Sequence, residues 1–214
     1  VFEEILAGYP WDFCQLQLNY MDTEIQAGLK GLALAREKGV PVMVMEPVKG
    51  GLLANPPQAA LEEFQRVSPG QSPAAWALRW AAGLEGVQTV LSGMSARGQV
   101  EENLRLFEGF RPLSREEGEA VSLAVEAYKA RTKVGCTGCD YCQPCPQGVP
   151  IPSIFHLWNK GAIFQQEEAS RQAYNALETD ASFCVDCGQC VERCPQGLDI
   201  PMELNQAHQE LWEP

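Results

Sequence analysis

The 214-residue sequence is poor in positive charge and contains no long hydrophobic run. Its 16 Lys and Arg stand against 28 Asp and Glu, which leaves a net charge of −12. Nucleic acids and anionic lipids attract proteins mainly through Lys and Arg, so neither is expected as a partner. The most apolar helical stretch, residues 74–87, is interrupted by Arg79 and Glu85 and is too short to cross a bilayer. We therefore expect no membrane insertion, and we see no secretory signal segment.

Histidine is also scarce, because His156 and His208 are the only two in the chain. Both fall in predicted helices near the cysteines, where surface or packing roles are more usual than catalysis. Neither a GxGxxG pattern nor a P-loop occurs. The titratable residues of the first half therefore assign no reaction by themselves.

Cysteine, in contrast, is abundant and unevenly placed. Eight of the nine cysteines lie in two clusters, whereas residues 15–135 contain none. Secreted domains held by disulfides scatter their cysteines through a short chain, so this clustering indicates metal binding in a reducing compartment. We expect a cytoplasmic protein. The isolated Cys14 lies in an apolar segment and is expected to be a buried structural thiol.

The two cysteine clusters repeat one motif. The first reads CTGCDYCQPCPQG, the second reads CVDCGQCVERCPQG, and each continues to Ile-Pro. The second matches C-x2-C-x2-C-x3-C-P, a pattern whose fourth cysteine binds the other cluster, and the first is one residue shorter. The spacing therefore predicts two 4Fe–4S clusters with exchanged fourth ligands. The first cluster would take Cys136, Cys139, Cys142 and Cys194, and the second would take Cys145, Cys184, Cys187 and Cys190.

Zinc and disulfides are the alternatives for these cysteines. Zinc sites usually pair two CxxC knuckles across a spacer, and one tetrahedral ion does not require three successive two-residue intervals. Disulfides are disfavoured by the expected compartment. If clusters are bound, Tyr141 and Phe183 beside the ligands are expected to shield them from water.

Strand and helix signals alternate in the first half of the chain. DFCQLQLN, VPVMVMEP and VQTVLSGM are predicted strands, the second of them buried on both faces. A helix is predicted over residues 23–38 with Thr23 as its N-cap, and another over residues 59–82 that breaks near Pro69 and restarts at Pro73. This alternation implies a parallel sheet with right-handed crossovers.

Three strands are too few for a closed barrel, so residues 1–112 are expected to be the C-terminal part of a larger α/β domain. The first ten residues, VFEEILAGYP, resemble the tail of a helix, which suggests that the chain is a fragment. Residues 113–132 are expected to form a linker helix that starts with a capping box of Ser114 and Glu117. Residues 133–214 lack strand signals and are expected to be mostly helical.

Two resemblances to known families follow from these motifs. WDFCQLQLNYMD, VPVMVMEPVKGGLLA and VLSGMSARGQVEENL resemble the last three strands of an aldo-keto reductase barrel. Residues 134–211 resemble the α-helical type of two-cluster ferredoxin. Together they imply an α/β protein in which a partial (β/α)8 TIM barrel, its last three strands, precedes a mostly α-helical ferredoxin-like domain. The barrel would bind NADP or NAD at the C-terminal ends of its strands.

The resemblance also implies which residues contact the nicotinamide cofactor. Gln15 would meet the nicotinamide carboxamide, and Glu102 and Asn103 would meet the adenine end. The loops beside the phosphates would be formed by Glu46, Pro47, Val48, Lys49, Gly50, Gly93 and Ser95. Met45 replaces the usual stacking aromatic residue, and Gln99 replaces a basic residue for the 2′-phosphate, a role that Arg97 could take. The alternative is that all these residues are ordinary barrel and loop structure.

The leading interpretation is an iron–sulfur oxidoreductase that couples a nicotinamide-binding barrel to electron transfer through two 4Fe–4S clusters. Its partner would be a redox protein or a small-molecule electron donor or acceptor. The alternative is a non-catalytic electron-transfer module in which the partial barrel is a scaffold. No catalytic residue is assigned, because the family's catalytic residues lie in the first half of its barrel.

Overall fold

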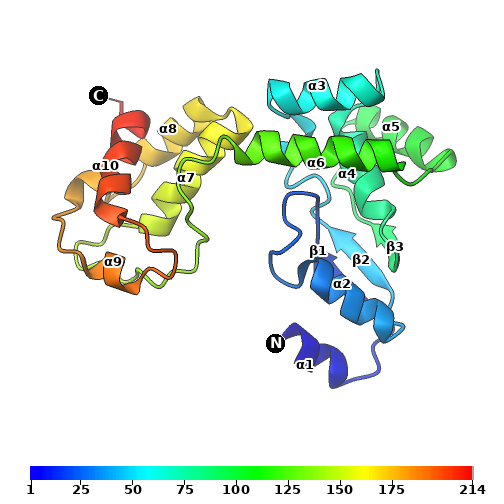
Figure 1. Cartoon of the computed structure of the whole chain (residues 1–214), viewed down its shortest axis with the longest axis horizontal. Helices are drawn as coiled ribbons and strands as arrows, with labels where there is room; N and C mark the ends of the chain where they lie inside the picture. The colour runs from blue at the N-terminus through cyan, green and yellow to red at the C-terminus, as the bar shows by residue number, and fades with distance from the viewer. Residues whose placement is uncertain (214) are drawn as a thin grey trace. The chain divides into compact units, whose positions relative to one another are not determined.

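The structure is a computed structural model that describes residues 1–213 (Figure 1). The chain forms two compact units, Val1–Ala127 and Tyr128–Pro214. The first combines a parallel sheet with helices, and the described part of the second contains helices but no strand. The chain therefore has the α/β composition that its sequence predicts.

The first unit alternates strands and helices. Its elements are α1 (Phe2–Ala7), β1 (Cys14–Gln17), α2 (Gly28–Glu37), β2 (Val42–Met45), the 3-10 helix η1 (Leu52–Ala54), α3 (Gln58–Val67), α4 (Pro73–Ala82), β3 (Val87–Val90), α5 (Arg97–Glu108) and α6 (Arg115–Lys129). The strands lie in the order β1-β2-β3 and both pairs are parallel, as predicted. Figure 1 shows α2 lying along β1 and β2, with which it is in contact.

One face of this sheet carries the core of the unit. Val42 and Val44 of β2 are fully buried and pack with Leu32 and Ala35 of α2. Successive side chains of a strand point to opposite faces. Met45, on the other side of β2, is 36% exposed, so the predicted burial of this strand on both faces is wrong. Cys14 is only half-buried, although burial does raise the pKa of its thiol.

The predicted start of the second helix is also wrong. The helix α2 begins at Gly28 with Ala27 as its N-cap, five residues after the predicted start. Gln26 and Gly28 both have φ near +54°, a left-handed conformation that cannot continue a right-handed helix. Thr23 instead accepts a hydrogen bond from the Leu29 N–H through its backbone carbonyl, at 2.8 Å.

Two predicted helix starts are confirmed. Ser72 caps α4, since its hydroxyl accepts a hydrogen bond from the Ala75 N–H at 3.1 Å, with a proline in the first turn. At the start of α6, the Ser114 N–H donates to Glu117 Oε2 at 2.7 Å, and the Glu117 N–H donates to Ser114 Oγ at 3.2 Å. This is the reciprocal capping box that the sequence predicts.

The second unit is a small helical bundle that carries the cysteine loops. Its elements are α7 (Ile151–Phe164), α8 (Glu167–Asn175), the 3-10 helix η2 (Ala181–Phe183), α9 (Gln189–Arg193) and α10 (Ile200–Leu211). The helices α7, α8 and α10 contact one another (Figure 1). Ile154 and Trp158 of α7, Tyr174 of α8, and Leu204 and Leu211 of α10 form its core.

Candidate functional site

The cysteine loops share an unusual backbone conformation around the second cysteine of each motif. Cys139 lies between Gly138 and Asp140, whose φ angles are +69° and +63°. Cys187 likewise lies between Asp186 and Gly188, at +52° and +73°. Left-handed residues turn the chain sharply, and glycine and aspartate tolerate this conformation better than most residues. Such turns let backbone N–H groups line a concave loop, an arrangement found at iron–sulfur sites.

The structure brings the eight clustered cysteines around two small cavities. Cys136, Cys139, Cys142 and Cys194 line the first cavity. Cys145, Cys184, Cys187 and Cys190 line the second, which Cys142 also reaches. Each cavity therefore combines three cysteines of one motif with the last cysteine of the other, and Cys142 lies between the two cavities.

The segments after the cysteines repeat the same geometry twice. The Gly148 N–H donates to the Cys145 carbonyl at 2.9 Å, and the Gly197 N–H donates to the Cys194 carbonyl at 3.1 Å. Both glycines have positive φ, +73° and +65°. The helices α7 and α10 then start with Ile-Pro, and each lies mainly over one cavity. Pro152 and Phe155 of α7 line the first cavity, whereas Pro201 and Leu204 of α10 line the second.

Burial and mutual proximity disfavour free thiolates in these loops. Burial raises the pKa of Cys142 to about 11, and the charges of Cys136, Cys190 and Cys139 add to this effect. The pKa values of Cys136 and Cys190 are also raised, and burial is the largest cause in both. Metal coordination reverses this preference, because a coordinating thiol is deprotonated.

The donor set of each cavity fits an iron–sulfur cluster. Four cysteine thiolates are the usual ligands of a 4Fe–4S cluster. Among residues 1–213, no three Cys, His, Asp or Glu side chains converge closely enough to hold a single metal ion. The thiols are instead distributed around the two cavities, with apolar side chains such as Ile151 and Leu198 between them.

Two amide side chains, which the sequence analysis did not identify, position the first cysteine loop. Gln143 donates from Nε2 to the Val149 carbonyl at 3.0 Å and accepts the Cys145 N–H at 3.0 Å. Asn159 of α7 accepts the N–H groups of Lys133 and Val134 at 2.9 and 3.1 Å. Both residues thus fix the backbone next to metal-ligand candidates. Of the two, only Gln143 carries a sequence signal for this role, because it lies within the first cysteine motif.

Tyr141, Phe183 and His208 lie near the cysteines but do not line the cavities. Tyr141 and Phe183 are 65% and 53% exposed, so they cover little of the loops that they adjoin. His208 lies on α10, where its Nδ1 is 2.6 Å from the Tyr174 hydroxyl and its ring stacks on Trp212. The Tyr174 hydroxyl in turn accepts the Ala181 N–H at 3.1 Å. This network supports the packing role predicted for His208.

A cavity of about 450 Å³ lies at the C-terminal ends of β2 and β3 in the first unit. Seven of the predicted nicotinamide contacts line it: Glu46, Pro47, Val48, Gly50, Gly93, Glu102 and Asn103. Met45 and Gln99, the two departures from the family pattern, line it as well. Gln99 caps α5, because its Oε1 accepts the N–H groups of Ser95 and Ala96 at 2.9 and 3.0 Å.

The other four predicted contacts do not line this cavity. Gln15 donates from Nε2 to Met45 Sδ at 3.0 Å, and Arg97 forms an ion pair with Glu101 at 2.7 Å. The Ser95 side chain is exposed, and Lys49 pairs with Asp22 at 2.5 Å. Their side chains are therefore directed to neighbours within the protein or to solvent.

A buried amide, which sequence reasoning also missed, fixes the loop after β2. Asn19 is fully buried and donates from Nδ2 to Asp22 Oδ2 at 3.0 Å and to the Glu46 carbonyl at 3.2 Å. Glu46 and Lys49 have φ angles of +57° and +51°, which are costly for residues with side chains. The Asn19–Asp22–Lys49 network holds this strained loop beside the cavity.

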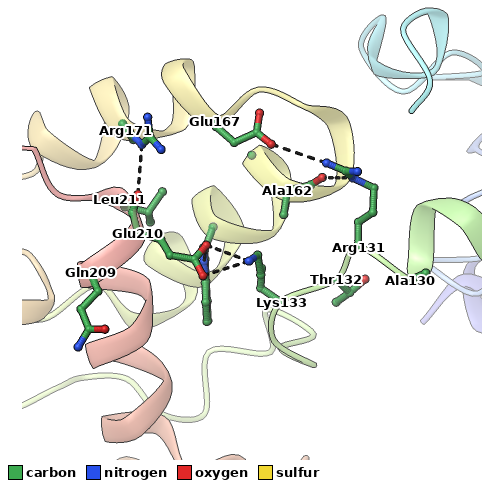
Figure 2. A pocket seen from close by; sticks show the side chains of 12 residues that line it. Ala130, Arg131, Thr132, Lys133, Ala162, Glu167, Arg171, Gln209, Glu210 and Leu211 are labelled. Atoms are coloured by element: carbon green, nitrogen blue, oxygen red, sulfur yellow. Dashed lines mark hydrogen bonds and ion pairs between the residues drawn. The ribbon is translucent and has the colours of Figure 1, made fainter. Parts of the chain in front are cut away.

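A further hollow, of about 500 Å³, lies among α7, α8 and α10 (Figure 2). Its three cations are each paired with a carboxylate: Arg131 with Glu167 at 3.7 Å, Lys133 with Glu210 at 3.0 Å, and Arg171 with Glu213 at 3.2 Å. Figure 2 also shows the Arg131 guanidinium on the Ala162 carbonyl. The pairs of Arg131 and Lys133 tie the segment before the first cysteine loop to the helices of the bundle.

None of the helices within residues 1–213 has both the length and the apolar content that crossing a bilayer requires.

Comparisons with solved structures found aldo-keto reductases. The holo form of aldo-keto reductase AKR11C1 from Bacillus halodurans is 25% identical, with a TM-score of 0.46 over 57% of this chain. The apo form is 24% identical, with the same TM-score and the same coverage. The chain spans 45–46% of the length of these two chains. No curated protein matched.

Comparison with protein-family models identified both parts of the chain. Residues 135–198 match the 4Fe-4S dicluster domain, and this match includes all eight clustered cysteines. The clustered cysteines therefore belong to an iron–sulfur domain of the ferredoxin-like kind. Residues 2–125, more than half of the chain, match the aldo/keto reductase family. The chain belongs to the aldo/keto reductase family and carries a 4Fe-4S dicluster domain next to its reductase segment.

Proposed function

We propose that the chain is the C-terminal part of an iron–sulfur oxidoreductase that couples a nicotinamide-binding barrel to electron transfer through two 4Fe–4S clusters. The observation that carries this proposal is the pair of cavities, each lined by at least four cysteines drawn from both motifs. In the proposal, residues 1–112 are the last three strands of a TIM barrel with their helices. Residues 113–132 are a linker helix, and residues 133–214 are a helical ferredoxin-like domain.

The cysteines would bind the clusters with their fourth ligands exchanged. Cys194 would complete the site of Cys136, Cys139 and Cys142, and Cys145 would complete the site of Cys184, Cys187 and Cys190. The lining of the two cavities supports this assignment. When bound, the clusters would supply one-electron carriers.

The cavity after β2 and β3 would hold NADP or NAD. Gly50 and Gly93 leave space for a close approach of the backbone, since a Cβ at Gly93 would meet no atom within 4 Å. Glu102 accepts a hydrogen bond from Ser72 Oγ, and Asn103 donates to Ser92 Oγ at 3.2 Å, so both side chains are held at the cavity wall. Gln15, Lys49, Ser95 and Arg97 would have to reorient to contact the cofactor.

The protein would exchange electrons with a redox protein or a small-molecule carrier in a reducing, cytoplasmic environment.

A scaffold role for the barrel segment makes a different prediction about cofactor binding. Titration of the protein with NADPH and NADH, followed by nicotinamide fluorescence, separates the two roles. Saturable binding supports the coupled oxidoreductase, and absence of binding by a protein that retains its clusters supports the electron-transfer module.

Metal analysis tests the proposed clusters directly. Protein purified without oxygen should contain about eight iron atoms and about eight acid-labile sulfides per chain, because each cluster holds four of each. It should also show the broad visible absorbance of iron–sulfur clusters, which dithionite bleaches. Zinc without sulfide would refute the proposal.

A further inference from the structure

The two cysteine cavities have matching walls but opposite charges. Within the described residues, Asp140 is the only charged side chain that lines the first cavity, and Arg193 is the only one that lines the second. Most of the remaining lining is apolar or cysteine in both cavities. This difference bears on the two clusters of the proposed function, and the inference below rests on that function.

The internal repeat makes the charge difference easier to interpret. The first cavity is covered by Ile151, Pro152 and Phe155 of α7 with Ile200 of α10, and the second by Pro201 and Leu204 of α10 with Ile151 of α7. These positions correspond in the two repeats, so the apolar shell around each cavity is similar. The polar lining differs where the motifs differ, because Arg193 lies in the three-residue interval of the second motif and the first motif has only two residues there.

Neither charge is neutralised by a neighbour. Arg193 is exposed, and no ion pair of Arg193 or Asp140 is present in the described part of the chain. Asp140 lies directly after Cys139, with its backbone in the left-handed region, and its charge contributes to the raised pKa of Cys136. Other carboxylates of these loops, Asp186 and Glu192, are exposed and line neither cavity.

We infer that Arg193 and Asp140 set the order of the two reduction potentials, so that the cluster at Cys145, Cys184, Cys187 and Cys190 is the easier one to reduce. Reduction adds one negative charge to a cluster. A nearby guanidinium stabilises that charge, and a nearby carboxylate opposes it. Because both side chains are at the surface, salt should weaken the effect.

A redox titration monitored by electron paramagnetic resonance tests this order on the full chain with both clusters loaded. Arg193→Gln should lower the higher of the two potentials, and Asp140→Asn should raise the lower one, so each change narrows the gap. At a fixed potential, each should change the reduced-to-oxidised ratio of one cluster by up to about tenfold, which is about 59 mV for a one-electron couple. Arg193→Lys should retain most of the original gap.

Control substitutions are available in the same unit. Glu192→Gln next to Arg193, and Lys160→Gln on α7, remove charges that line neither cavity and should leave the gap unchanged. The inference is overturned if Arg193→Gln widens the gap, shifts both potentials equally or has no more effect than the controls. Iron and sulfide contents are measured for each variant. Loss of the clusters from the unaltered protein would contradict the proposed function, whereas two intact clusters with unshifted potentials would contradict only the order.

Discussion

The side chain of Asn159 pairs with the backbone of Val134 in both directions. Its Nδ2 donates to the Val134 carbonyl at 2.8 Å, and its Oδ1 accepts the Val134 N–H at 3.1 Å. Val134 is buried and lies two residues before Cys136. The middle of α7 therefore anchors the entry to the first cysteine loop.

Asn159→Ala should destabilise the second unit by about 1–3 kcal/mol, because the buried backbone groups of Val134 lose their partners. Iron should also be released faster from the first loop. Chelator-induced loss of visible absorbance measures the rate, and chemical denaturation measures the stability. Asn205→Ala is the control, since Asn205 is exposed and its side chain accepts a hydrogen bond from the exposed Gln209. Equal behaviour of the two variants would show that the anchor has no effect.

Cys145→Ser should damage the cluster held mainly by the second motif, because Cys145 lines the cavity of Cys184, Cys187 and Cys190. Cys194→Ser should have the reciprocal effect on the first cluster. Electron paramagnetic resonance of the reduced proteins should show two different remaining signals. Cys184→Ser should remove the signal of the second cluster. If Cys145→Ser leaves that signal in place, the exchanged assignment is wrong.

Gly93→Leu should weaken nicotinamide binding at least about tenfold, which is about 1.4 kcal/mol. A Cβ at Gly93 enters open space at the cavity and meets no protein atom within 4 Å, so folding should be unaffected. Gly98→Leu is the matched control, since Gly98 is equally open but does not line the cavity. Fluorescence titration with NADPH compares the two variants, and equal affinities would argue against this cavity as the cofactor site.

Glu117→Gln should destabilise the first unit by about 3 kcal/mol, the order expected for breaking a buried ion pair. Arg79 is 8% exposed and donates to both carboxylate oxygens of Glu117, at 2.5 and 2.8 Å. The Arg79 guanidinium holds the pKa of Glu117 below its usual value of 4.5. The pair therefore stabilises the fold above that value, and its contribution is lost as the pH falls through the lowered pKa.

Denaturation of the unaltered protein between pH 3 and pH 7 checks this pH dependence, with Glu119→Gln as a control. Glu119 lies on the same helix in an exposed pair with Arg115. The Glu117→Gln variant should lose less stability on acidification than the unaltered protein does. If both lose the same amount, the pair does not account for the acid sensitivity.

The sequence predicts the strands and the grouping of the cysteines because both depend on local patterns. Alternation of apolar and polar segments defines the strands, and the intervals between Cys136, Cys139 and Cys142 define a loop. The start of α2 is not predicted correctly, because the left-handed backbone at Gln26 and Gly28 depends on packing rather than on helix periodicity. Asn19 and Asn159 act through backbone groups that are distant along the chain, so no local pattern identifies them.

Side-chain direction is the other limit of sequence reasoning at this site. The family resemblance assigns Gln15 and Lys49 to the cofactor, but in the structure their side chains contact Met45 and Asp22. Ala169 and Ala173 of α8 are exposed, whereas Ser170 and Tyr174 of that helix are buried. The apolar residues of a short helix do not by themselves identify its buried face, because small alanines lose little by remaining in water.

The sharing of cysteines between the two loops makes each half of the iron–sulfur domain dependent on the other. Neither loop by itself supplies four thiols to a cavity, and the segment that separates Cys145 from Cys184 contains the helices α7 and α8. The chain must therefore have passed well beyond the second motif during synthesis before either cavity is complete. A ribosome that stops, or a protease that cuts, between the motifs would leave two incomplete sites rather than one intact one.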